Sequence, residues 1–236
     1  MQLFYSSDIA PNDVEFVFNK EESRHMVRVL RKVEGDILHI TNGRGYLFEV
    51  EILVASNNKC VVKVIQVQQK SPSSYHLHIA IAPTKLNDRF EWFLEKATEI
   101  GIQEISPIIC DHSERKMLKE ERLHKILQSA MKQPQQTYLP KLNALTTFSK
   151  FLSNYKDKSV SKYIAHCSTT EKVSLRDSIS LHQPYLILIG PEGDFSENEI
   201  NEALSTGFKP LTLGPTRLRT ETAAIVSCQN VAFIHQ

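Results

Sequence analysis

The 236-residue sequence lacks most features that would assign it to a specialised class of protein. It has no apolar run close to the roughly 20 residues that span a bilayer, and its N-terminus has no basic region followed by a long apolar stretch. We therefore expect no membrane span and no signal peptide, and a cytoplasmic location. An excess of one charge is also missing, because 28 Lys and Arg residues nearly balance 27 Asp and Glu residues. Local basic patches must then meet any nucleic-acid partner.

Cysteine is scarce, and the four residues form no Cys-x-x-Cys pair; they are Cys60, Cys110, Cys167 and Cys228. This spacing argues against a zinc knuckle and a disulfide framework, so reduced and mostly buried thiols are expected. His76 and His78 alternate on a predicted strand but lack a third ligand, so no metal site is predicted. The sequence also lacks the glycine-rich dinucleotide and phosphate-loop signatures, which argues against an unrelated nucleotide-binding hydrolase.

The first seventy or so residues are β-rich. Predicted strands at residues 37–40 and 47–53 flank a turn that contains Asn42-Gly43, a pair typical of β-hairpins. A second turn at residues 56–58 leads to a strand over residues 60–65. Several short strands at close spacing favour a small β-barrel. The polar, proline-containing stretch 68–74 then predicts a linker.

Beyond the linker, strands alternate with helices, which favours a mostly parallel sheet. The predicted strands cover residues 76–82, 105–110, 163–165, 185–189 and 211–213. A helix is predicted over residues 87–101, with Gly101 as its C′ residue, and another around residues 123–130. The capping box Ser196-x-x-Glu199 opens a helix that ends at Gly207, and Thr220 is the expected cap of the last helix.

Two loops near the C-terminus, residues 189–196 and 213–222, each follow a short apolar run and lead into a helical pattern. Both are therefore expected at the carboxyl ends of strands, the edge where open α/β sheets bind ligands. Their glycines and prolines allow the backbone to approach a ligand closely. An ordinary pair of strand-to-helix turns is the alternative interpretation.

Charged side chains in these loops are candidates for chemistry on a polar substrate. Arg217 and Arg219 stand where a loop becomes a helix, and the planar guanidinium of Arg219 suits a phosphate or a developing oxyanion. Glu221 has two interpretations, a catalytic carboxylate or a favourable charge in the first helical turn. Glu192 likewise is either an exposed loop charge or a carboxylate beside a substrate.

A basic cluster in the N-terminal region suggests contact with nucleic acid. If residues 21–32 form a helix, Arg24, Arg28 and Arg31 share one stripe with His25 adjacent, and apolar positions remain for packing at Met26, Val29, Leu30 and Val33. The stripe suits a phosphate backbone. A solvated helix face is the alternative.

These segments resemble the RsmE family, SPOUT-class methyltransferases that act on N3 of a uridine in 16S ribosomal RNA. The most specific motifs are Gly-Pro-Glu-Gly-x-Phe-Ser at residues 190–196 and Leu-Gly-x-x-x-Leu-Arg-Thr-Glu-Thr-Ala at residues 213–223. Weaker ones lie at residues 25–36, like the family's RNA-binding barrel, and at residues 91–101, like its first catalytic-domain helix. The resemblance covers nearly the whole chain.

The resemblance implies an α/β fold with a PUA-like β-barrel at residues 1–70, a linker at 71–75 and a SPOUT domain with a trefoil knot at 76–236. It also implies a homodimer, S-adenosyl-L-methionine as cofactor and the small ribosomal subunit as partner. The implied cofactor-binding residues are Ile189, Gly190, Pro191, Gly193, Leu213, Gly214 and Leu218. The candidate catalytic residues are Arg219, Glu221, Glu192 and Arg217, and the candidate RNA-binding residues are Arg24, His25, Arg28 and Arg31.

The sequence departs from the family pattern at three places. Asp194 replaces a usual glycine, which predicts a stiffer loop or an added polar contact. Thr216 stands where arginine is common, with Arg217 in place of the aliphatic neighbour, and Gln136 also stands where arginine is common. Two alternative functions remain: methylation of another ribosomal or transfer RNA position, and a non-catalytic RNA-binding assembly factor.

Overall fold

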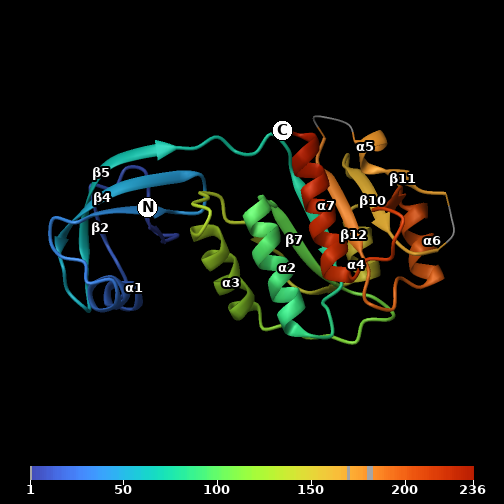
Figure 1. Cartoon of the computed structure of the whole chain (residues 1–236), viewed down its shortest axis with the longest axis horizontal. Coiled ribbons are helices and arrows are strands. Elements are labelled where there is room, and N and C mark those ends of the chain that lie inside the picture. Colours follow the sequence, from blue (N-terminus) through green and yellow to red (C-terminus); the bar gives the residue numbers. More distant parts are fainter. Residues whose placement is uncertain (1, 169–170, 180–182) are drawn as a thin grey trace. The chain divides into compact units, whose positions relative to one another are not determined.

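The computed structural model describes residues 2–168, 171–179 and 183–236, which form two compact units. One unit comprises Met1–Pro72 and Met131–Leu139, and the other Ser73–Ala130 and Pro140–Gln236 (Figure 1). The sequence did not indicate that Met131–Leu139 joins the N-terminal unit. Backbone hydrogen bonds fix it there, from Gly45 N to Thr137 O at 2.8 Å and from Leu139 N to Gly43 O at 2.9 Å. Within the described ranges, no helix is long and apolar enough to cross a membrane.

The N-terminal unit is built on a five-stranded sheet. Its spatial order is β1 (Leu3–Tyr5), β3 (Ile37–Thr41), β4 (Tyr46–Val54), β5 (Val61–Gln69) and β2 (Glu15–Val17). The predicted β3–β4 hairpin is confirmed, and its turn glycines Gly43 and Gly45 have φ of 72° and 91°. The prediction that the linker begins at residue 68 is wrong. Strand β5 continues through Gln69, and Lys70 N still donates to Gly45 O at 2.8 Å.

The helix predicted over residues 21–32 is also wrong in extent. Helix α1 (Lys20–Arg24) continues as the π-helix η1 (His25–Val29), in which Leu30 N donates to His25 O at 3.0 Å. This wider i→i+5 turn changes the faces that successive residues occupy. The chain then leaves helical conformation, because Arg31 has φ of 53°. Of the apolar positions expected to pack, only Met26 is fully buried; Val29 is 69% exposed.

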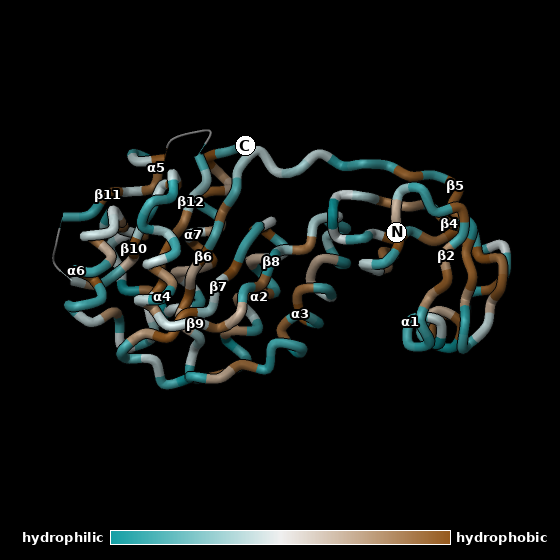
Figure 2. The backbone as a smooth tube through the Cα atoms, turned by 180° about the vertical axis from the view of Figure 1, so that it is seen from behind, coloured by the Kyte–Doolittle hydropathy of each residue, from teal (hydrophilic) through white to brown (hydrophobic). Residues whose placement is uncertain are grey.

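The C-terminal unit contains a parallel sheet, which confirms the predicted fold class. Its order is β11 (Val173–Ser174), β13 (Lys209–Thr212), β10 (Ser161–Ala165), β12 (Tyr185–Ile189), β6 (Leu77–Ile81), β7 (Glu104–Ile109) and β8 (Lys141–Leu142), with β9 (Thr146–Thr147) also paired to β7. Every residue of β6 and β12 is buried, as expected for central strands covered on both faces. Figure 2 shows hydrophobic segments along the strands of both units.

Helices cover the two faces of this sheet. Helix α2 (Asn87–Ile100) packs beside α7 (Thr220–Ile234), and α7 contacts β6 and β12. Helices α4 (Phe148–Ser153) and α6 (Glu197–Ser205) contribute to a core cluster with Ala80, Leu186 and Leu188. The short helix α5 (Leu175–Ser178) follows β11. Helix α3 (Glu120–Lys132) connects the segment after β7 to Met131–Leu139.

In the C-terminal unit, the start of α6 and the end of α2 follow their sequence signals, whereas the start of α7 does not. Gly101 ends α2 with φ of 102°, and Ser196 and Glu199 form the predicted capping box of α6. The prediction that Thr220 caps α7 is wrong, because Arg219 is the N-cap residue and no side chain caps the helix. The Thr220 hydroxyl instead donates to Gly190 O at 3.0 Å. The trefoil knot stays a prediction from the family resemblance.

Candidate functional site

A cavity of about 630 Å³ opens at the carboxyl ends of β10, β12 and β13. The two loops singled out in the sequence form much of its wall, because parallel strands end at the same edge of the sheet. Six of the seven predicted cofactor-binding residues line it: Ile189, Gly190, Pro191, Leu213, Gly214 and Leu218. Gly214 has φ of 128°, a backbone conformation that side-chain-bearing residues rarely adopt.

The first loop folds tightly over the aromatic ring of Phe195. A Cβ atom on Gly190 would lie 3.0 Å from that ring, so glycine permits this close approach. Gly193, the seventh predicted residue, does not line the cavity. It faces His112 instead, whose Nδ1 lies 3.1 Å from Gly193 O.

The structure shows how Asp194 can occupy a position where the family usually has glycine. Its φ is 66°, in the left-handed region that favours glycine but that aspartate also visits. Its carboxylate accepts hydrogen bonds from Cys167 N at 2.8 Å and Phe195 N at 2.9 Å. The predicted additional polar contact is therefore confirmed, and it joins the loop after β12 to the loop after β10.

Three of the four candidate catalytic residues line the cavity: Glu192, Arg217 and Arg219. Arg217 Nη2 donates to the backbone oxygen of Glu192 at 3.2 Å, and the Glu192 carboxylate accepts from Lys85 N at 3.0 Å. These contacts connect the loop after β13 to the loop after β12, and the loop after β12 to the segment that follows β6. The guanidinium groups of both arginines are exposed and therefore accessible to a polar substrate.

The structure does not bring Glu221 into the cavity. Its side chain is buried on the side of α7 that faces α2, and its Oε1 lies 3.7 Å from Arg89 Nε. The other oxygen, Oε2, is buried and has no hydrogen-bond partner among the residues that the structure describes. The orientation of a helix about its axis determines which partner such a residue meets, and the loop sequence alone does not encode it.

The sequence analysis missed two titratable residues of the cavity wall, His166 and Lys172, which follow β10. Burial and the charge of Lys172 lower the pKa of His166. The available signal was position: residues just beyond a third parallel strand belong to the same sheet edge.

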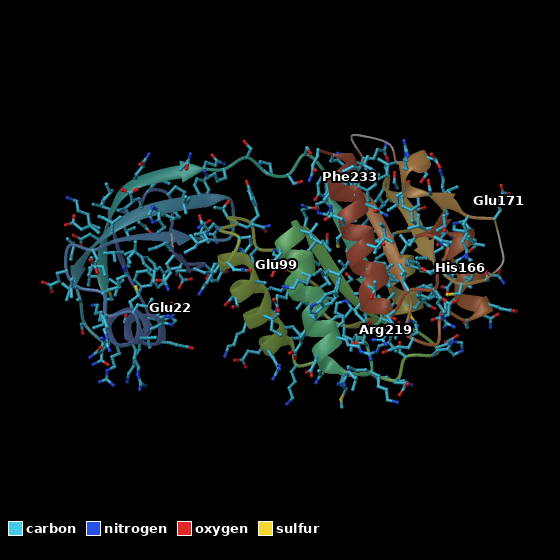
Figure 3. The ribbon with its side chains drawn as sticks, in the orientation of Figure 1. Glu22, Glu99, His166, Glu171, Arg219 and Phe233 are labelled. Carbon is cyan, nitrogen blue, oxygen red and sulfur yellow. The ribbon has the colours of Figure 1, made fainter. Side chains whose placement is uncertain are left out.

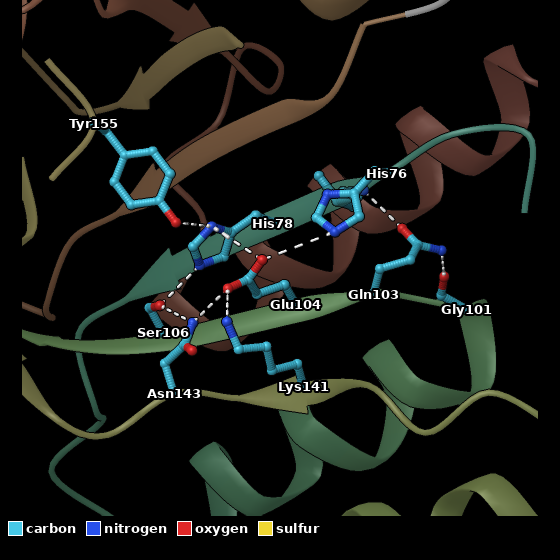
Figure 4. A network of polar contacts seen from close by, with 10 residues as sticks. His76, His78, Gly101, Gln103, Glu104, Ser106, Lys141, Asn143 and Tyr155 are labelled. Atoms are coloured by element: carbon cyan, nitrogen blue, oxygen red, sulfur yellow. Dashed lines mark hydrogen bonds and ion pairs between the residues drawn. The ribbon is translucent and has the colours of Figure 1, made fainter. Parts of the chain in front are cut away.

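A second polar cluster lies near the amino-terminal ends of β6 and β7 (Figure 4). His78 is buried, with Nε2 2.8 Å from Ser106 Oγ and Nδ1 3.1 Å from the Tyr155 hydroxyl. His76 and His78 face the same side, because both lie within 4.0 Å of Glu104. Burial lowers the pKa of His78 to about 4, although the Glu104 charge opposes this shift.

The predicted RNA-binding residues belong to the N-terminal unit. Arg24, His25, Arg28 and Arg31 are all exposed and lie along one chain segment. Because η1 and the left-handed Arg31 interrupt the helix, they do not form the regular helical stripe that their spacing predicted.

The fold and the cavity between the two loops are typical of a small-molecule-binding α/β enzyme, and comparison with known proteins identifies the enzyme class. Residues 71–232 match the RNA methyltransferase domain family, and residues 18–65 match the RNA methyltransferase PUA domain family. The protein is thus an RNA methyltransferase with a PUA-type N-terminal domain, as the fold-class prediction stated.

Individual relatives show which family of RNA methyltransferases the chain belongs to. The ribosomal RNA small subunit methyltransferase E of Buchnera aphidicola is 30% identical, covering 96% of this chain and 90% of its own length. A Porphyromonas gingivalis structure, described as a probable rRNA-methyltransferase, has TM-score 0.91 and 38% identity and covers 100% and 98% of the two chains. A Legionella pneumophila methyltransferase in complex with the bound cofactor SAM has TM-score 0.87 and 27% identity, with coverage of 98% and 97%. The chain belongs to the ribosomal RNA small subunit methyltransferase E family, the RsmE family that its motifs resemble.

Proposed function

We propose that this protein transfers a methyl group from S-adenosyl-L-methionine to N3 of a uridine in the 16S RNA of the small ribosomal subunit. The observation that carries the proposal is the cavity between the two carboxyl-edge loops, with Arg217 and Arg219 in its wall. Family membership and the names of the relatives support an RNA of the small subunit as the substrate. Such a substrate favours a cytoplasmic location.

The residues of the cavity fit this cofactor. A volume of about 630 Å³ lies within the range of roughly 300–1,000 Å³ that is typical of small-molecule sites. Apolar walls from Ile189, Leu213 and Leu218 suit the adenosine portion, while the backbone at Gly190 and Gly214 can approach closely. The relative from Legionella pneumophila, at 27% identity, binds SAM.

When bound, the cofactor supplies a methyl group already activated on a positively charged sulfur. Uracil N3 carries a proton at neutral pH, so it attacks well only after that proton is lost. Ile189, Leu213 and Leu218 would hold the cofactor, which would supply the methyl group to N3 and keep the electrons of its carbon–sulfur bond on sulfur. The residues of this chain must therefore orient the base and stabilise negative charge on its two carbonyl oxygens.

Arg219 is the residue that we assign to this charge stabilisation, assisted by Arg217. Both are exposed at the cavity, and their guanidinium groups present several N–H donors in a plane. Glu192 is the better candidate for the proton acceptor, because it lines the cavity whereas Glu221 points towards Arg89. N3 lies on the pairing edge of uracil, so the base must be unpaired or flipped out of a helix.

The exposed basic cluster of Arg24, His25, Arg28 and Arg31 is proposed to hold the RNA backbone that flanks the target base.

We also propose a homodimer. Trp92 on α2 is 43% exposed and Phe233 on α7 is 69% exposed, and aromatic residues are enriched at protein interfaces (Figure 3 labels Phe233). Light scattering should give twice the chain mass of 26.9 kDa, and a mass of one chain would contradict the dimer.

The decisive experiment measures transfer of labelled methyl to small ribosomal subunits from cells that lack this methylation, followed by identification of the labelled nucleoside. We expect N3-methyluridine, with no label on large subunits treated in parallel. Label in another nucleoside would keep the reaction class but replace the target base. Absence of both label and cofactor binding would overturn the enzyme and leave an RNA-binding assembly factor.

A further inference from the structure

One histidine in the wall of the cavity has an incomplete set of hydrogen bonds. His166 directly follows β10, which pairs with β12 on one side and β13 on the other. It lines the cavity and is only 7% exposed. Figure 3 labels it together with Arg219, which lines the same cavity.

The two ring nitrogens of His166 have different surroundings. Nδ1 lies 2.8 Å from Ser168 Oγ, whereas Nε2 is buried and has no hydrogen-bond partner among residues 2–168, 171–179 and 183–236. Buried polar atoms in folded proteins are almost always paired with protein groups, water or a ligand, so an unpaired one on a residue that lines a cavity is a position where a ligand atom can complete the set. If the Ser168 hydroxyl donates to Nδ1, Nε2 carries the proton and needs an acceptor.

The electrostatic surroundings suit a positively charged cofactor. Burial lowers the pKa of His166, and the charge of Lys172 lowers it further, while Asp194 opposes them. The ring is therefore held in its neutral form near neutral pH. A neutral ring donates a hydrogen bond without adding a positive charge beside the sulfonium.

We propose that His166 Nε2 donates a hydrogen bond to bound S-adenosyl-L-methionine, and that Ser168 orients the ring by donating to Nδ1. The assignment rests on the proposed function. The accepting atom belongs either to the nucleoside or to the carboxylate of the amino-acid portion; the chemistry is a neutral N–H donor facing an acceptor in both cases. No feature of the sequence around residues 166–168 had indicated this role.

Calorimetric titration of the full-length protein tests the assignment without relying on turnover. The ligands are S-adenosylhomocysteine, which does not react, and 5′-methylthioadenosine, which lacks the amino-acid portion. His166→Phe keeps a ring of similar size but removes the donor, and we expect about 3- to 10-fold weaker S-adenosylhomocysteine binding, the range of one neutral hydrogen bond. His166→Gln, which keeps an N–H donor, should recover part of the loss.

The two ligands locate the acceptor. Equal weakening for both would place it on the nucleoside, and weakening for S-adenosylhomocysteine alone would place it on the amino-acid portion. His124→Gln, an exposed histidine on α3, serves as the matched control and should bind both ligands as the wild type does. Should His166→Phe fail to fold, His166→Gln compared with His166→Ala gives the same test.

Wild-type affinity in both donor-free variants would overturn the role of His166 and leave the methyltransferase proposal intact. It would mean that a water molecule satisfies Nε2 in the complex. A wild-type protein that binds neither ligand would instead overturn the proposed function itself, and the His166 assignment with it.

Discussion

The two ends of the parallel sheet in the C-terminal unit differ in whether the nitrogens of their buried histidine have hydrogen-bond partners. Near the amino-terminal ends of β6 and β7, both nitrogens of His78 have partners, and Ser106 Oγ also accepts from Asn143 Nδ2 at 2.7 Å (Figure 4). At the carboxyl ends of β10 and β12, His166 Nε2 has no partner within the described part of the chain. The first end also has a carboxylate, Glu104, that bonds Lys141 Nζ at 3.0 Å, whereas the second exposes Arg217 and Arg219.

This difference suggests that the amino-terminal end of the sheet contributes to stability and the carboxyl end to ligand binding. A complete hydrogen-bond network in a low-dielectric interior makes the fold specific, and it leaves no donor or acceptor for a ligand. An incomplete set in a cavity wall leaves a donor or acceptor that a bound ligand can pair with. Substitutions at the amino-terminal end should therefore change stability, and substitutions at the carboxyl end should change binding or turnover.

The largest expected effect is at the carboxyl end. Arg219→Ala removes a donor that we assign to the uracil anion, so turnover should fall about 100- to 1,000-fold, as it does when an oxyanion donor is removed. The cavity walls and Gly190 remain, so cofactor affinity should change little. Methyl-transfer kinetics on small ribosomal subunits and calorimetric cofactor binding measure the two quantities separately.

Arg176→Ala is the matched control, because Arg176 is exposed on α5 and does not line the cavity. It should keep wild-type turnover. If Arg219→Ala weakened cofactor binding as strongly as turnover, Arg219 would bind the cofactor rather than the base.

The long elements and the positions of the two loops followed from the sequence because their signals are local. The apolar face of α2 repeats with helical spacing, Gly101 follows it, and Ser196 with Glu199 forms a capping box within four residues. Parallel strands then bring residues 190–193 and 213–219 to one edge, whatever the details of packing. The site was therefore located correctly at the level of loops.

Features that depend on contacts between distant segments were not predictable. The π-turn at His25–Val29 has no local signature that a hydrophobic pattern reveals, so the helix was extended too far. Thr220 carries a residue type typical of a helix cap, yet its hydroxyl contacts Gly190, 30 residues away. Glu221 contacts Arg89, which lies on another helix. Whether His166 Nε2 has a hydrogen-bond partner depends on all the segments that pack around the ring, which the local sequence does not reveal.

A pair of serine substitutions compares the two ends directly. Ser106→Ala removes Oγ from both His78 and Asn143, so the free energy of unfolding should fall by about 3 kcal/mol, the upper end for a buried group left unpaired. Ser168→Ala removes the partner of His166 Nδ1 at an exposed position where water can replace the hydroxyl, so stability should change by less than about 0.5 kcal/mol. Urea unfolding at pH 7 measures both. Equal losses would show that the cavity wall, like the amino-terminal network, is built for stability.

An effect smaller than that of Ser106→Ala is a pH dependence that originates at His78. Its pKa is about 4 in the folded protein and about 6.5 in the unfolded chain, so between these values the unfolded state binds more protons. Stability should therefore fall as the pH falls from 6.5 towards 4. Linkage gives a loss on the order of 2 kcal/mol between pH 7 and pH 5 from this residue.

Urea unfolding at both pH values isolates this contribution through its difference. His78→Gln should lose about 2 kcal/mol less than the wild type between pH 7 and pH 5, because it has no imidazole to protonate. His124→Gln, on the exposed face of α3, should keep the wild-type loss. Glu104 lies 4.0 Å from His78 Nδ1 and its charge favours protonation of the ring, so Glu104→Gln should lower the pKa of His78 further and extend its loss of stability below pH 4. If His78→Gln were as acid-sensitive as the wild type, the amino-terminal network would have to accommodate a charged ring, and its completeness would not explain its stability.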